Sequence, residues 1–238
     1  MTSSEFVKLT AMHHRHIALG AKIVSEDGWL RPEKYTSIEE EEDAARRNVA
    51  IYDISNLLKI DLKGKDIGKL RTISNKSLEI GHVSDFTIGK KGILGENSWW
   101  KLTNDNVLIT SSLQDKDGLI SMLIQKSINC VHITDVSSGY AGISIIGPRS
   151  RDVLSKLTEL EISSKGFHDH SCASTRLAGV HAIIGRIDVN NILSFVVLVS
   201  REYGEFIWNI IMNAGQEFYI KPIGIASYRK LKEEVKID

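Results

Sequence analysis

The sequence has few of the features that announce a metal site, a disulfide framework or a charged binding surface. Its only two cysteines, Cys130 and Cys172, lie far apart and outside any C-x-x-C pair, so neither a zinc ribbon nor a disulfide framework is indicated. Thirty basic and thirty acidic residues leave no net charge, which disfavours binding to nucleic acids and other polyanions. A reducing, cytoplasmic location fits this composition.

Long apolar runs and nucleotide-binding motifs are lacking as well. The longest apolar run, from Ile192 to Val199, is interrupted by Ser194 and is too short to span a bilayer. Segment 1–16 has no apolar core of signal-peptide length. No glycine-rich phosphate loop, dinucleotide fingerprint or hydrolase nucleophile elbow occurs. What remains is a globular chain with 42% apolar and 25% charged residues.

Three prolines and the absence of repeats or low-complexity runs favour one compact unit. Ser37 followed by Glu40 is a capping-box pattern, so we expect a helix from there through Arg46 and Arg47. Asn104 to Asn106 lies between apolar runs and predicts a hairpin turn. Further helices are expected over 65–73, 113–127, 149–160, 205–213 and the C-terminal end, and further strands over 51–64, 140–147, 174–188 and 192–200.

Neither the clustered histidines nor Cys172 indicates a metal site or a catalytic nucleophile. His13, His14 and His16 are close in sequence, but a metal needs three or four ligands that converge in space, and these follow one another on a polar segment. No metal is therefore expected. Cys172 is expected to be a small buried residue, because the sequence positions no base beside it for nucleophilic chemistry.

Three residues are candidates for an interface. Trp99 and Trp100 are adjacent, so in a strand their side chains face opposite sides and at least one is expected to be partly exposed. The alternative is that one fills the core while the other lies under a loop. Arg176 could donate to an interface ion pair or be a solvated strand residue.

Four segments occur in the order and at the separations typical of one family: HIALGAKIVSEDGW, SIEEEEDAARRNVAIYDIS, HITDVSSGYAGISIIGPRSRDVL and IWNIIMNAGQEF with KPIGI. Together they resemble the folate-binding aminomethyltransferases of the glycine-cleavage T-protein family, over nearly the whole chain. The resemblance implies an α+β fold of two interlocked α/β subdomains around a folate pocket, without the family's C-terminal β-barrel.

The resemblance also implies a division of the chain. The whole chain, 1–238, is expected to form a single domain of the folate-binding type. Within it, one subdomain is expected to combine about 1–50 with 137–225, and the other about 51–136 with 226–238.

Three further segments look closer to the gamma subunit of heterotetrameric sarcosine oxidase: LTELEISSKGF, HSCASTRLAGV and SREYGEFIW. This implies a non-catalytic subunit of a flavin-dependent N-methyl amine oxidase in one-carbon metabolism, a hetero-oligomer whose larger flavoprotein subunits carry FAD and FMN. The alternative is a stand-alone tetrahydrofolate-dependent aminomethyltransferase or methyltransferase. The family's iron-sulfur maintenance branch ranks last, because its K-G-C-Y-x-G-Q motif is absent.

The catalytic position of the family is altered. The family has an Asn-Asp pair whose aspartate interacts with the folate amine, and the aligned pair here is Asn75-Lys76. A lysine is cationic at neutral pH and offers donors where the chemistry needs an acceptor. The usual aminomethyl transfer is therefore not expected, and no catalytic residue is assigned. Tyr52, Asn75, Lys76 and Glu96 match positions that line the folate pocket, so tetrahydrofolate binding stays possible.

A second family mark, the G-Y-T-G-E loop whose glutamate holds the pterin ring, aligns with 188–192. Ile192 stands at the glutamate position, and an unsatisfied pterin edge costs about 1–3 kcal/mol for each lost partner. Asp188 is the nearest carboxylate. The favoured interpretation is that Asp188, Asn190 and Asn191 form a turn between two strands.

Overall fold

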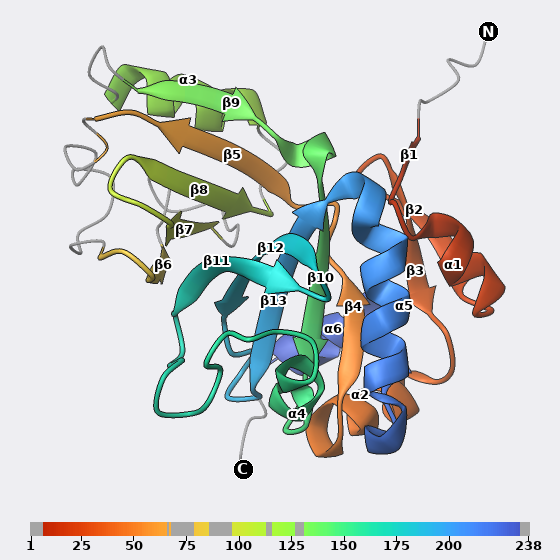
Figure 1. The fold of residues 1–238 in the computed structure, drawn as a ribbon. Coiled ribbons are helices and arrows are strands. Elements are labelled where there is room, and N and C mark those ends of the chain that lie inside the picture. The colour runs from red at the N-terminus through yellow and green to blue at the C-terminus, as the bar shows by residue number, and fades with distance from the viewer. Residues whose placement is uncertain are drawn as a thin grey trace, which may run out of the picture.

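The structure is a computed structural model of the chain. It describes residues 7–65, 67, 79–85, 97–112, 116–126 and 131–233. In this part the chain forms three β-sheets, of six, five and three strands, with helices packed between and around them (Figure 1).

The six-stranded sheet forms the centre of the molecule. Its order is β11 (Cys172–Leu177), β12 (Val180–Arg186), β13 (Ser194–Ser200), β10 (Tyr140–Ile146), β4 (Ala50–Asp53) and β14 (Lys221–Pro222). Neighbouring strands are antiparallel except β14, which runs parallel to β4. Side chains of successive residues in β13 point to opposite faces, and both faces are buried.

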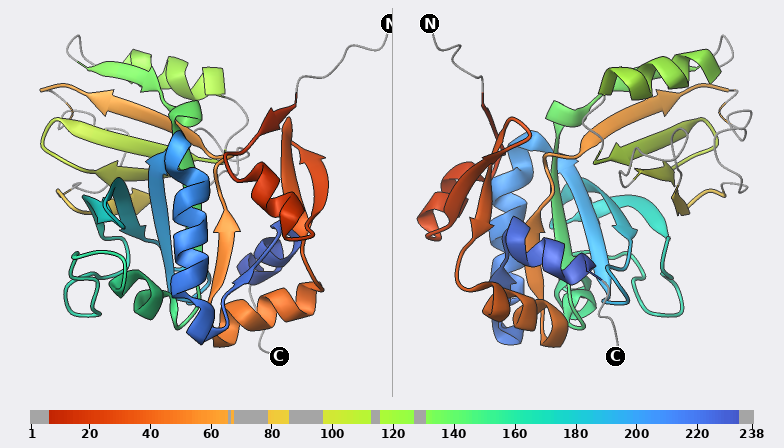
Figure 2. Two further views of the ribbon diagram at one scale, coloured as in Figure 1. Left: turned by 45° about the vertical axis from the view of Figure 1, so that its right-hand side comes forward. Right: turned by 180° about the vertical axis from the view of Figure 1, so that it is seen from behind.

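Two different layers cover the faces of this sheet. On one face lie α4 (Ser150–Ser155) and α5 (Gly204–Ala214), whose apolar side chains join those of β10 and β13 in one core cluster. On the other face, α2 (Ile38–Arg47) and α6 (Ile225–Lys232) share a second core cluster with the five-stranded sheet. Figure 2 shows α5 and α6 on opposite sides of the sheet.

The five-stranded sheet has the order β6 (Val83–Asp85), β7 (Asn97–Lys101), β8 (Asn106–Ser111), β5 (Leu58–Lys63) and β9 (His132–Asp135), all antiparallel. Its outer face packs against α3 (Lys116–Lys126). The three-stranded sheet, β1 (Lys8–Leu9), β3 (Trp29–Lys34) and β2 (Lys22–Glu26), lies near α1 (His13–Ala18).

Several expected elements are confirmed. Ser37 caps α2, and its hydroxyl accepts a hydrogen bond from the Glu40 N–H at 3.2 Å. The turn expected at Asn104 to Asn106 joins β7 to β8. The helix expected before Gly215 is α5, with Gly215 as its C-cap. The helix expected over 65–73 lies almost entirely outside the described residues.

Two expected strands are wrong in the same way, because each is in fact a pair of strands. The run 51–64 divides into β4 and β5, which belong to different sheets, and the chain crosses between the sheets at 54–57. The run 174–188 folds back at Ala178 and Gly179, both with positive φ, into the β11–β12 hairpin. The expected helix over 149–160 is also shorter, since α4 ends at Ser155.

The sheets also differ from the expected subdomain boundaries. The change of sheet occurs at 54–57 rather than after residue 50, so β4 belongs to the central sheet. Helix α6 contacts α2 and β3, and its apolar side chains lie in the core cluster under the central sheet. The segment 226–232 therefore contacts α2 and β3 of the first part of the chain, in a core cluster that also contains side chains of the five-stranded sheet.

The expectation that one of the two adjacent tryptophans is exposed is wrong. Trp99 is 3% exposed and Trp100 is 1% exposed. Trp99 packs in the cluster under α3, whereas Trp100 faces the central sheet and donates its indole N–H to Thr110 Oγ1 at 2.9 Å. Both faces of β7 are covered, so neither tryptophan is at the surface as the interface assignment required.

The contact between the two sheets predicts a stability effect at Gly185. A Cβ atom built there would lie 2.1 Å from Trp100 Cζ3, so Gly185→Ala should lower the free energy of unfolding by about 1–3 kcal/mol through overpacking. Urea denaturation measures this value. Gly139→Ala is the control, because its added Cβ meets nothing within 4 Å. Equal stability of the two variants would contradict this packing.

Candidate functional site

Of the four pocket positions inferred from family resemblance, the structure describes Tyr52. The other three, Asn75, Lys76 and Glu96, lie outside the described residues. Tyr52 is in β4, where it pairs with Ser144 of β10 in the middle of the central sheet.

The Tyr52 side chain is buried between an arginine and a second tyrosine. Its ring stacks on Tyr228 of α6, with ring centroids 4.2 Å apart and an angle of 19° between the planes. Its hydroxyl oxygen accepts a hydrogen bond from Arg31 Nη2 at 2.6 Å, and Arg31 Nη1 donates to Glu26 at 3.1 Å. Burial raises the pKa of Tyr52 to about 12, although Arg31 acts against this shift. Tyr52 is therefore a protonated phenol held in place by α6 and β3.

The next residue along β4, Asp53, begins a hydrogen-bonded chain of three side chains, of which Asp53 and His16 are buried and Tyr35 is partly buried. Asp53 Oδ2 lies 2.9 Å from His16 Nε2, and His16 Nδ1 lies 2.8 Å from the Tyr35 hydroxyl. His16 is fully buried and its ring packs edge-on against Trp208 of α5, with centroids 5.0 Å apart. The chain connects α1, the β3–α2 connection and the central sheet.

The protonation states in this chain follow from its geometry. Burial raises the pKa of Tyr35, and the nearby Asp53 and Glu41 carboxylates raise it further. Tyr35 therefore keeps its proton, and its hydroxyl and the Asp53 carboxylate hydrogen-bond to the two ring nitrogens of His16. Burial would raise the pKa of Asp53, but hydrogen bonds from His16 and Ser55 lower it below its usual range. Both ring nitrogens of His16 therefore have a partner within the fold.

Asp53 also shapes the point where the chain crosses between sheets. Its Oδ1 accepts a hydrogen bond from the Ser55 N–H at 2.8 Å, and the Gly142 N–H donates to Ser55 Oγ at 3.0 Å. The Lys59 ammonium group is fully buried below this crossing and donates to the carbonyl oxygens of Ser55 at 2.9 Å and Leu57 at 3.0 Å. The crossing is thus held by a carboxylate from one sheet and an ammonium group from the other.

A second buried carboxylate, Glu41, joins α2 to the start of α6. Its Oε1 accepts from the backbone N–H groups of Tyr35 at 2.5 Å and Thr36 at 3.0 Å. Its Oε2 accepts from the Gly224 N–H at 2.8 Å and from Ser227 Oγ at 2.6 Å. The Glu41 carboxylate is fully buried and all of its partners are donors of the protein itself, so its role is to hold α2 against the start of α6.

The segment aligned with the pterin-binding loop of the resembled family is a tight turn. Asn190 and Asn191 have φ of 48° and 65°, and Val189 and Ile192 exchange backbone hydrogen bonds of 2.9 Å. The turn expected from the sequence is therefore confirmed. The neighbouring carboxylate, Asp188, receives two hydrogen bonds from the Arg186 guanidinium, at 3.0 and 2.7 Å.

Cys172 is buried as expected, at 4% exposure, and burial raises the pKa of its thiol to about 12. This favours the thiol over the nucleophilic thiolate. Within the described ranges, no group of three or more His, Cys, Asp and Glu side chains could hold a metal ion. No described helix is long and apolar enough to cross a membrane.

Sequence reasoning missed the buried histidine and the buried lysine. His16 was grouped with its polar neighbours, although a spacing of three residues places His13 and His16 on one face of α1 and both are buried. Lys59 follows apolar neighbours in an alternating run, and nothing local shows that its ammonium group meets two carbonyl oxygens. Arg176, the remaining interface candidate, is exposed on β11.

The buried Lys59 predicts a pH dependence of stability. Burial lowers its pKa from 10.5 to about 8 in the folded state, so the unfolded chain binds more protons between pH 8 and 10 and stability from this group rises with pH in that window. The contribution is roughly 3 kcal/mol at most. Lys59→Met should remove the rise, as measured by urea denaturation from pH 7 to 10.

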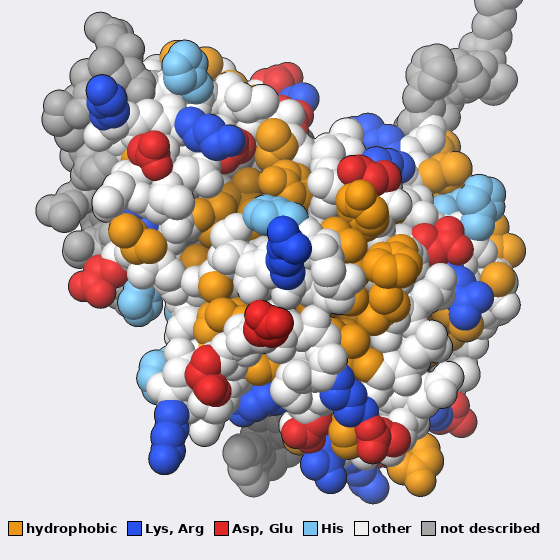
Figure 3. All heavy atoms as spheres, in the orientation of Figure 1, with side chains coloured by type: hydrophobic (Ala, Val, Ile, Leu, Met, Phe, Trp, Pro, Cys, Tyr) orange, Lys and Arg blue, Asp and Glu red, His pale blue; other side chains and the backbone are white. Residues whose placement is uncertain are grey.

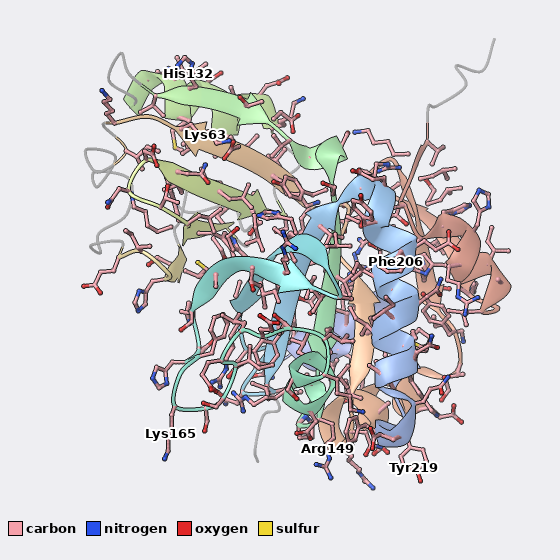
Figure 4. All side chains as sticks on the ribbon, viewed as in Figure 1. Lys63, His132, Arg149, Lys165, Phe206 and Tyr219 are labelled. Atoms are coloured by element: carbon pink, nitrogen blue, oxygen red, sulfur yellow. The ribbon has the colours of Figure 1, made fainter. Side chains whose placement is uncertain are left out.

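Lys165→Met is the matched control, because Lys165 lies at the surface (Figure 4). It should keep the rise between pH 8 and 10. A Lys59→Met profile with the same slope as the wild type would show that Lys59 is not the group responsible.

Comparison with known proteins supports the fold and the family. Sarcosine oxidase subunit alpha of Corynebacterium sp. (strain U-96) is 28% identical over 257 residues, covering 95% of this chain and 26% of that protein. An aminomethyltransferase of Caldanaerobacter subterraneus subsp. tengcongensis is 26% identical over 239 residues, covering 98% of this chain and 64% of that protein. The chain thus spans less than two thirds of the length of either relative.

Two solved structures share the fold. Glycine cleavage system aminomethyltransferase T from Bartonella henselae superposes with a TM-score of 0.81 at 15% identity, over 95% of this chain and 62% of that chain. A chain of heterotetrameric sarcosine oxidase from Corynebacterium sp. U-96 superposes with a TM-score of 0.64 at 16% identity, over 88% of this chain and 95% of that chain. The expected α+β aminomethyltransferase fold is confirmed. Residues 12–237 match the GCVT N-terminal domain family, and the chain belongs to that family.

Proposed function

We propose that this chain is a non-catalytic subunit of a flavin-dependent N-methyl amine oxidase or dehydrogenase complex of the sarcosine oxidase type. The observation that carries the proposal is Lys76, which stands where the resembled transferases have their catalytic aspartate. A lysine at that position offers only N–H donors, where the aspartate would accept a hydrogen bond from the folate amine. The larger partner subunits would carry FAD and FMN.

The lengths of the matched proteins support a subunit role. The sarcosine oxidase chain that superposes on this one is covered over 95% of its length, so it is a short chain of similar size. Sarcosine oxidase subunit alpha is much longer, because nearly all of this chain covers only 26% of it. Domains of this fold are therefore present in relatives both as part of a large chain and as a small separate chain.

The carboxylates of the described chain support the absence of transferase chemistry. Glu41 and Asp53 are its only buried carboxylates in the described ranges, and each is occupied by hydrogen bonds from the protein. A carboxylate that already accepts from several donors is a poor acceptor for a substrate amine. Neither residue can stand in for the aspartate replaced by Lys76.

The outer surface of α5 is consistent with contacts to another chain. Tyr203 and Phe206, at its N-terminal end, are 44% and 47% exposed, and Figure 4 shows Phe206 on α5. Aromatic side chains are enriched in protein interfaces. Figure 3 shows acidic and basic side chains interspersed over this face, without a patch of one sign, which suits a partner bound mainly by packing.

The second candidate function is a working tetrahydrofolate-dependent aminomethyltransferase, favoured by the 26% identity to an aminomethyltransferase over 98% of this chain. The two functions predict different folate affinities. Under the proposed function, calorimetry of the isolated chain should detect no saturable binding at millimolar tetrahydrofolate. Saturable binding by the wild-type chain would contradict the proposal and favour the transferase.

A substitution of Lys76 tests whether this residue is what prevents folate binding. Lys76→Asp restores an acceptor for the folate amine and removes the opposing charge, which should raise affinity by at least roughly tenfold, since a hydrogen bond to a charged group contributes about 1.5–3 kcal/mol. Lys65→Asp makes the same charge change at an exposed position and serves as the control. Equal affinities of the two variants would show that Lys76 is not what prevents binding.

A further inference from the structure

A polar hollow lies between the end of α4 and the β11–β12 hairpin, away from Tyr52 and the buried network around Asp53. Its volume is about 1010 Å3. It is lined by three basic side chains, four with hydroxyl groups, one acidic and one apolar side chain; the basic ones are Lys156, Arg176 and His181. Sites for apolar ligands are lined mainly by hydrophobic and aromatic side chains, so this hollow suits a polar ligand. Its basic side chains outnumber the one acidic side chain, which favours an anionic group on that ligand.

Arg176 differs from the other exposed arginines in the part of the chain that is described. Arg47 pairs with Asp43, Arg149 with Asp152 and Arg229 with Glu26. Arg176 has no ion pair or side-chain hydrogen bond within the described ranges. Its fork of N–H donors is therefore available to a carboxylate from outside the chain.

The neighbours of Arg176 on the hairpin present further polar groups to the same side. His181 is its direct partner across the β11–β12 pair, so the two side chains lie on one face. His181 Nε2 is 2.9 Å from Ser174 Oγ, two residues before Arg176. Lys156 is less available, because it is bound to Glu217 and to the Ala214 carbonyl oxygen. Arg176 is thus the main cation for a ligand.

The backbone at the hollow favours a polypeptide over a small anion. β11 is the last strand of its sheet. Along its outer edge, the Cys172 N–H donates to the Gly81 carbonyl oxygen at 2.6 Å, and the Arg176 carbonyl oxygen accepts from Thr158 Oγ1 at 2.7 Å. Backbone groups of a strand alternate in direction, so the N–H and C=O of Ser174 point to that same edge. An extended segment could pair there, as in strand addition.

We propose that this hollow binds an acidic segment of a partner polypeptide, with a carboxylate on Arg176 and a backbone hydrogen bond at Ser174. The inference rests on the proposed function, because the partner is taken to be a larger chain of the same complex. Glu159 lines the same hollow, and its charge opposes that of the ligand. The site therefore contains one side chain that strengthens binding and one that weakens it.

The first test is an NMR titration of the isolated chain with a hexaglutamate peptide. Saturable shifts are expected at Ser174, Arg176 and His181. Arg176→Gln should weaken binding roughly threefold to tenfold and Glu159→Gln should strengthen it, as expected for partly exposed charges. Arg47→Gln, which removes an exposed arginine elsewhere, is the control and should leave affinity unchanged. Equal loss in the Arg176 and Arg47 variants, or no shifts at the hollow, would overturn the proposal.

Two further experiments test whether the ligand is a polypeptide or a small anion, and whether Arg176 holds a partner chain. If inorganic phosphate shifts the same resonances with the same affinity as the peptide, the site takes a small anion and the polypeptide proposal is wrong. The second arm purifies tagged wild-type chain and Arg176→Gln from the native host at rising salt. The variant should lose its partner chains at lower salt. Equal retention would overturn this inference while leaving the proposed function intact, whereas no partner with the wild type would contradict the proposed function itself.

Discussion

The hydrogen bonds of Asp53 hold together the point on which the arrangement of the two large sheets depends. At 54–57 the chain leaves the central sheet and enters the five-stranded one. Asp53 orients this crossing through the Ser55 N–H and is itself held by His16. Lys59 closes the other end by donating to Ser55 and Leu57. A carboxylate and an ammonium group that are both buried remain charged only because such partners surround them.

The same crossing brings the two sheets face to face. Trp100 from the five-stranded sheet reaches Gly185 of the central sheet, where only hydrogen fits. The core cluster that includes Trp100 also contains apolar side chains of α2 and α6, and those helices are joined by Glu41. The contact between the sheets, the attachment of α2 and α6 and the crossing at 54–57 therefore depend on one another. Tyr52 lies within the same core cluster.

How well the sequence predicts this structure depends on whether the deciding contacts are local. The α2 cap and the Asn190-Asn191 turn were predicted, because each depends on residues within a few positions. The crossing at 54–57 was not, since apolar alternation continues through it while the pairing partner changes. The exposure of Trp99 and Trp100 was misjudged for a related reason, because coverage of both faces of β7 depends on distant elements. The His16–Asp53 contact also joins residues far apart in sequence.

The two buried carboxylates, Glu41 and Asp53, already accept hydrogen bonds from the protein. In the described ranges they stabilise the fold, and the proposed function adds that Lys76 takes the place of the catalytic aspartate. The chain keeps the aminomethyltransferase fold, while Arg176 on β11 and two aromatic side chains at the N-terminal end of α5, Tyr203 and Phe206, are exposed. This distribution suits the proposed role as a subunit that other chains hold.

The most direct test is to purify the tagged chain gently from its native host and record its partners and its visible absorption spectrum. The account predicts a yellow complex in which larger flavoprotein chains are present in fixed ratio with this one. A colourless chain that elutes alone would contradict the account, and the folate-dependent transferase would then become the better explanation.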